Sequence, residues 1–157
     1  MKLAAKHDIE APAAFIFAQL ADFETWERAA MRRGADVMRS DTLRIPGPGM
    51  TWDCRFNYAG KDRKATIRLD AITPATAMVL TGLSVPVEGV MHLDILDLAA
   101  KRTRIEVRLE IKPRTLTARI YVQSLRLARS RVERGFAKRV AQLAVEIEDR
   151  FRRSLRT

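Results

Sequence analysis

The chain has 157 residues, of which 47% are hydrophobic and 31% charged, with one cysteine and a net charge of +10. This composition excludes a disordered chain or a disulfide-stapled domain, and we expect residues 1–157 to form one domain with its own core. No apolar run is long enough to span a membrane and the first residues lack a signal-peptide core, so the cytoplasm is the expected location.

The first part of the chain predicts a strand followed by two short helices. Residues 2–10 alternate loosely and predict a strand at the edge of a sheet. Pro12 suits the first turn of a helix, and the apolar residues after it recur every three or four positions. This spacing predicts helices over about 12–21 and 23–31, with Asp22 placed to cap the second helix.

From residue 35 the hydrophobic period changes to two, which predicts strands joined by tight turns. The clearest strand is 50–58, where Trp52, Cys54, Phe56 and Tyr58 share one face. Six strands are predicted in this part of the chain: 35–45, 50–58, a strand through 65–69 that ends at Thr73, 76–83, 87–98 and 103–111.

Residues 114–155 predict a long amphipathic helix. Its apolar residues form one stripe at steps of three and four: Leu125, Ala128, Val132, Phe136, Val140, Leu143, Ile147, Phe151 and Leu155. A helix cannot bury such a stripe against itself, so we expect the sheet to lie beneath it. Gly135 is the expected position of any kink, and residues 115–128 fit either a continuation of this helix or a separate lid.

These elements predict an α+β fold in two layers. We expect a curved seven-stranded antiparallel sheet wrapped around the long C-terminal helix, with two short helices after the first strand. The curvature follows from the twist of a wide sheet.

Two segments, IEAPAAFIFAQLADFETWE and KPRTLTARIYVQSLRLARSRVERGF, together with this element order, resemble the START/polyketide-cyclase-like (SRPBCC) superfamily and its helix-grip fold. The front signature of that superfamily is matched by Ile9, Pro12, Phe15, Phe17, Asp22, Phe23 and Trp26. The resemblance implies an apolar cavity between sheet and helix that holds lipids, hormones, polyketides or similar molecules. Because the superfamily contains carriers, sensors and enzymes, the fold alone does not assign a function.

The candidate site is this cavity, which the inward faces of the strands and of the long helix would line. The expected lining residues are Trp52, Cys54, Phe56, Tyr58, Ile67, Leu69, Leu80, Met91, Leu93, Val107, Leu109, Tyr121, Leu125 and Arg129. Ligand pockets are mostly apolar with a few placed polar groups, and Tyr58 or Tyr121 could supply one. The alternative is that the same side chains pack together and fill the core.

The sequence carries no phosphate-binding glycine loop and no GxSxG, HExxH or CxxC motif. His92 is out of phase with Met91 and Leu93, so we expect it on the outer face of the sheet. Cys54 lies on the apolar face and is expected to be inert. We therefore assign no catalytic residue, no metal ligand and no cofactor.

Three functions follow, in order of preference. The first is binding or carriage of a hydrophobic, lipid- or polyketide-like small molecule in the cavity. The second is a polyketide cyclase/dehydrase-like enzyme, which needs an ionisable group inside the cavity that the sequence does not identify.

The third is an interaction module built on the arginine-rich C-terminal helix. From Arg114 onward the chain has twelve basic and four acidic residues. We favour weak contact with an anionic membrane over nucleic acid, because no aromatic residues alternate with these arginines to stack on bases. The sequence makes no prediction about the oligomeric state.

Overall fold

The computed structural model describes residues 1–156, and its elements follow the predicted order. In these residues the chain forms β1 (Lys2–Ile9), α1 (Ala13–Leu20), α2 (Phe23–Arg32), β2 (Asp36–Arg39), β3 (Thr51–Tyr58), β4 (Lys61–Thr73), β5 (Ala77–Leu83), β6 (Val87–Ala99), β7 (Arg102–Pro113), α3 (Leu116–Leu127) and α4 (Arg129–Ser154).

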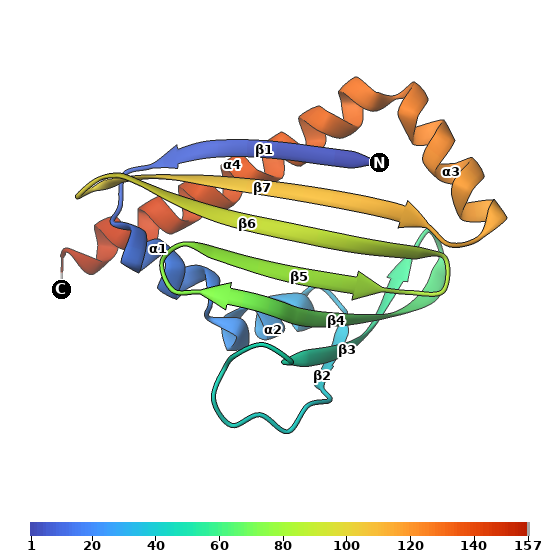
Figure 1. Cartoon of the computed structure of the whole chain (residues 1–157), viewed down its shortest axis with the longest axis horizontal. Coiled ribbons are helices and arrows are strands. Elements are labelled where there is room, and N and C mark those ends of the chain that lie inside the picture. Colours follow the sequence, from blue (N-terminus) through green and yellow to red (C-terminus); the bar gives the residue numbers. More distant parts are fainter. Residues whose placement is uncertain (157) are drawn as a thin grey trace.

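The seven strands form one antiparallel sheet in the order β1-β7-β6-β5-β4-β3-β2. From β2 to β7 each strand pairs with the next one in the chain, and β1 closes the far edge against β7. The helices α1, α2 and α4 lie on one face of this sheet, which we call the inner face, whereas α3 stands at the end where β7 stops (Figure 1). The predicted α+β architecture is confirmed.

Two residues of the front signature have structural roles at the junction of α1 and α2. The Asp22 carboxylate accepts hydrogen bonds from the backbone N–H and the hydroxyl of Thr25, which caps α2 as predicted and lowers the pKa of Asp22. The indole N–H of Trp26 donates to the carbonyl of Leu20 at 3.1 Å. These contacts fix the angle between the two helices.

The predicted strand 35–45 is wrong in its second half, because β2 ends at Arg39. The carboxylate of Asp41 accepts hydrogen bonds from the backbone N–H groups of Leu43 and Thr51 and pairs with the guanidinium of Arg39 at 2.5 Å. These bonds turn the chain away from the sheet and anchor the following loop at the start of β3. They also hold the pKa of Asp41 well below its usual range.

Residues 114–155, predicted to form a long amphipathic helix with the place of 115–128 left open, form two helices that meet at Ala128, and Gly135 lies inside α4. Residues 115–128 therefore follow the second of the two expected arrangements, a separate helical segment. A straight helix over residues 116–154 would be roughly 58 Å long. The longest strands have 13 residues and span roughly 43 Å, so one unbroken helix would overrun the sheet.

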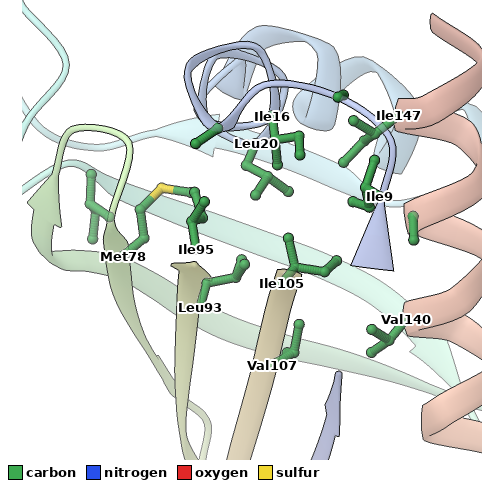
Figure 2. Close-up of a cluster of buried hydrophobic side chains, with 14 of the residues drawn as sticks. Ile9, Ile16, Leu20, Met78, Leu93, Ile95, Ile105, Val107, Val140 and Ile147 are labelled. Carbon is green, nitrogen blue, oxygen red and sulfur yellow. The ribbon is translucent and has the colours of Figure 1, made fainter. Parts of the chain in front are cut away.

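The core lies where α4 from Val140 onward, α1 and the end of β1 cover the inner face. Figure 2 shows its side chains converging from all of these elements, and they include Ile9, Ile16, Leu20, Met78, Leu93, Ile95, Ile105, Val107, Val140 and Ile147. The buried hydroxyl of Thr103 donates to the carbonyl of Ala11 and so satisfies a polar group at this end. No helix among residues 1–156 combines the length and apolarity needed to cross a lipid bilayer.

We expect Ile147→Ala to lower the free energy of unfolding by about 2–5 kcal/mol, because Ile147 is 1% exposed and the deletion leaves a cavity beneath α4. Val145→Ala is the matched control, since Val145 lies on the same helix and is 53% exposed. Urea denaturation followed by circular dichroism measures both variants. Equal losses from the two substitutions would contradict the assigned face of α4.

Candidate functional site

The inner face of the sheet is packed at one end and uncovered at the other. Along β3 the inward side chains go from buried Trp52, at 6% exposure, through half-buried Cys54 and exposed Phe56 to Tyr58, at 55%. The cause lies in α4, whose buried residues are Val140, Ala144 and Ile147, whereas none of its first eleven residues is buried.

The same trend holds along β4, β6 and β7, where the inward residues nearest α3 are half-buried while those nearest α1 are buried. The edge strand β1, which packs against α4, is the exception. We call the uncovered stretch of the inner face the trough, and its residues are Phe56, Arg63, Ile67, Gly82, Gly89, Met91, Leu109 and Ile111.

Two glycines form the floor of the trough. Gly82 of β5 and Gly89 of β6 are direct cross-strand partners, and they lie in one row with Ile67 of β4 and Ile111 of β7. A Cβ added to Gly82 would meet no atom within 4 Å, so the space above this residue is open. The sheet therefore presents backbone rather than side chains at this part of the trough.

A pair of tyrosines joins α3 to the rest of the molecule across the end of the trough. The hydroxyl of Tyr58, at the end of β3, lies 3.0 Å from the hydroxyl of Tyr121 in α3. This hydrogen bond raises the pKa of Tyr121 above its ordinary value. The contact bridges residues that are 63 positions apart in the chain and ties the β3–β4 hairpin to the helix.

Arg63 brings a cation to the same place. Its cross-strand partner is Phe56, and the alternation of β4 puts it on the same face as Ala65 and Ile67. The Nε of its guanidinium is buried and has no hydrogen-bond partner among the described residues. A buried donor without an acceptor costs roughly 1–3 kcal/mol, and more when charged, so this N–H group favours an incoming oxygen atom.

The fourteen residues expected to line a cavity fall into three groups. Trp52, Leu69, Leu93 and Val107 belong to the closed core. Cys54, Ile67, Leu80, Met91, Leu109 and Leu125 are half-buried, and Phe56, Tyr58, Tyr121 and Arg129 are exposed.

Arg129 lies outside the trough, in the first turn of α4. Its guanidinium pairs with Glu133 at 2.7 Å. Cys54 is half-buried beside the core, and burial raises the pKa of its thiol, which agrees with the inert role expected for it.

Two open grooves lie along the sheet, and each borders the trough, the first at Ala65 and the second at Leu109. One, of about 870 Å³, crosses β2, β3, β4 and the turn after β5, and among the expected lining residues it contains only Cys54. The other, of about 800 Å³, lies between β1, β7 and the start of α4 and contains Leu109 and Arg129. His92 borders this second groove, and its cross-strand partner Arg108 confirms its predicted place on the outer face.

Sequence reasoning missed Arg63, although the signal was present. The period of two through Leu69, Ile67 and Ala65 extends directly to residue 63. The predicted inner face contains apolar residues only, so it leaves out a charged residue that occupies an inward position of the same strand. Among residues 1–156 no cluster of three or more His, Cys, Asp or Glu side chains is placed to hold a metal ion.

No protein-family model and no curated protein sequence matches this chain. Solved structures match it along nearly its whole length. The Zhui aromatase/cyclase from Streptomyces sp. R1128 is 18% identical, with a TM-score of 0.68 over 96% of this chain and 94% of that one.

Two further structures give the same result. The protein TTHA0849 from Thermus thermophilus is 12% identical, with a TM-score of 0.66 over 94% of this chain and 97% of that one. A START superfamily protein from Mycobacterium smegmatis is 12% identical, with a TM-score of 0.57 over 90% and 98% of the two chains. The chain therefore has the START-like helix-grip fold that the resemblance implied.

We expect Tyr58→Phe to lower the pKa of Tyr121 toward its ordinary value, because the hydrogen bond between the two hydroxyls is the largest cause of its elevation. The chain has only two tyrosines, so Tyr121 alone titrates in this variant. Ultraviolet absorbance of the phenolate during alkaline titration measures the shift. Unchanged titration at the high-pH end would show that the two hydroxyls are not in contact in solution.

Proposed function

We propose that this protein binds a hydrophobic small molecule in the trough, with an oxygen-bearing or anionic end of the ligand at Arg63. The observation that carries the proposal is the uncovered inner face beside α3, where apolar residues such as Ile67 and Met91 remain only half-buried. Covering apolar surface contributes roughly 25 cal/mol for each Å² removed from water, so a ligand seated there would gain affinity from area alone.

The polar groups of the trough suit an amphipathic ligand rather than a hydrocarbon. Arg63 supplies a buried N–H donor without an acceptor, and Lys61 lies opposite Tyr58 at the rim. A guanidinium is permanently charged and binds carboxylate, phenolate or enolate oxygens strongly. The likeness to START-like and aromatase/cyclase structures also supports a hydrophobic ligand of this kind.

The test is a substitution that places a large side chain at the floor of the trough. We expect Gly82→Phe to fold normally, because the space above Gly82 is open, and to weaken ligand binding at least about tenfold by occupying that space. Leu83→Phe is the matched control, since Leu83 is the next residue of β5, faces the other side of the sheet and is exposed. Native mass spectrometry of protein purified from its own host, and fluorescence of the anionic probe anilinonaphthalenesulfonate, measure binding.

Loss of the bound mass and of probe binding in Gly82→Phe alone supports the trough. A host-purified protein with no added mass that also fails to bind the probe would overturn the proposal. Equal binding by the two phenylalanine variants would place the ligand outside the trough and away from the groove that Leu83 lines, and so in the groove beside β1, β7 and the start of α4.

A second function, an aromatase/cyclase-like enzyme, is favoured by the position of Arg63. The sequence identified no ionisable group inside the cavity, whereas Arg63 puts a fixed positive charge on the inner face. Such a charge would stabilise the enolate oxygen that forms during an intramolecular aldol condensation. In that reaction a methylene carbon bonds to a ketone carbon, and the ketone oxygen leaves as water with two protons.

Arg63→Met separates the two functions, with Lys64→Met on the opposite face of β4 as control. Binding of the anionic probe should fall by about tenfold to a hundredfold in Arg63→Met, because a hydrogen bond to a charged group is worth about 1.5–3 kcal/mol. A linear poly-β-ketone thioester is then incubated with each protein. An enzyme would lower its mass by one water in the wild type and in Lys64→Met but not in Arg63→Met, whereas a carrier would return it unchanged.

A further inference from the structure

The helix α3 has two apolar faces that point in opposite directions. Ala118 and Val122 are buried and Leu125 is half-buried, which defines the inward face. Leu116, Ile120 and Leu127 are 74%, 61% and 92% exposed. At 100° per residue these three positions fall within about 40° of one another on the side of the helix opposite the inward face.

The segment that carries this outward stripe has only positively charged side chains. Residues 114–132 contain five arginines and no acidic residue. Arg119 and Arg126 lie along one flank of the stripe by helical spacing. At the base of α3, the guanidinium of Arg114 donates to the carbonyl of Ser84 at 2.7 Å, which brings the 80% exposed Val85 beside the start of the helix.

The position of α3 makes this stripe accessible. The helix stands at one extremity of the molecule, beyond the end of β7 and away from the loop that follows β2 (Figure 1). No described element packs closely on the outward stripe, since its three residues stay more than half exposed, and the contacts of α3 with β7, α4 and Tyr58 use its other sides. A soluble domain rarely leaves several large apolar side chains aligned and uncovered, so the stripe calls for a partner.

We propose that the outward stripe of α3 docks on the surface of an anionic lipid bilayer. An interfacial helix combines an apolar stripe, which enters the acyl boundary, with flanking cations that meet the lipid phosphates. Leu116, Ile120 and Leu127 supply the first element, and Arg119 and Arg126 supply the second. This inference is independent of the ligand proposed for the trough, because it uses only the outward side of α3.

The arginine-rich surface of α3 argues against most other binding partners for the outward stripe. A second copy of the chain would bring two arginine-rich, acid-free surfaces together, and like charges repel. Nucleic acid would pair with the arginines but would leave the apolar stripe exposed to water. An acidic protein partner is the remaining competitor, and the experiment distinguishes it.

Co-sedimentation with vesicles tests the proposal on the full chain, purified free of ligand. The wild type should bind vesicles of equal parts phosphatidylcholine and phosphatidylglycerol at least about tenfold more tightly than vesicles of phosphatidylcholine alone. The double variant Ile120→Gln with Leu127→Gln should lose about tenfold or more of the binding to anionic vesicles. Met38→Gln, on β2, removes an equally exposed apolar residue elsewhere and should bind like the wild type.

A second double variant, Arg119→Gln with Arg126→Gln, should also bind weakly, and its remaining affinity should depend less on salt. All the residues substituted in these vesicle experiments are exposed, so circular dichroism should show unchanged folds. Wild-type protein that ignores anionic vesicles would overturn the proposal, and this is the outcome expected if the stripe serves an acidic protein. Binding that the Ile120→Gln, Leu127→Gln variant retains in full would also overturn it, as general adsorption by a chain of charge +10.

Discussion

The structure depends on how much of a long apolar sheet face one helix can cover. The strands β4 and β6 have 13 residues each, and most of their inward positions are apolar, with Lys61 and Arg63 at the start of β4 as exceptions. The buried residues of α4 extend only from Val140 to Ile147, which is about 10 Å of helix. With α1 and α2 this closes the end of the sheet shown in Figure 2, and the inner face beside α3 stays open. The opening is therefore a consequence of geometry rather than of a defect in packing.

The break at Ala128 belongs to the same constraint. Because an unbroken helix would overrun the sheet, the chain stops, and α3 continues in a new direction with its own small buried face, Ala118 and Val122. The polar contact between Tyr58 and Tyr121 then spans the gap between α3 and the β3–β4 hairpin. An exposed hydrogen bond of this kind contributes only about 0.5–1.5 kcal/mol, so the position of α3 is held far less firmly than that of α4.

Hydrophobic periodicity predicted most of this fold because each strand has one face toward solvent and one face toward the apolar interior. The alternation Trp52, Cys54, Phe56, Tyr58 gave the correct inner face of β3, and the turn residues gave the meander. Two features, the end of β2 and the break at Ala128, could not be predicted from periodicity, and each has a physical reason. Alternation continues past Arg39, but hydrogen bonds to the Asp41 side chain override it. Val122 and Val140 are 18 residues apart, which is five whole helical turns, so the apolar stripe runs through Ala128 without a change of phase. The candidate site was harder to predict, since the closed core and the trough contain the same apolar residue types. Trp52 is buried and Phe56 is exposed only because α4 covers the first and not the second.

The weakly held helix α3 has apolar side chains on two opposite sides. Its inward face borders the trough, and its outward stripe meets the surroundings of the protein. Fully burying a leucine or isoleucine side chain contributes about 1.5–3 kcal/mol, so an environment that buried Leu116, Ile120 and Leu127 would outweigh the Tyr58–Tyr121 hydrogen bond several times over. The fold thus makes α3 the element whose position responds to what lies outside, whereas the core beneath α4 does not depend on it. If the trough holds a ligand as proposed, burial of the outward stripe would act on the same helix that borders this ligand.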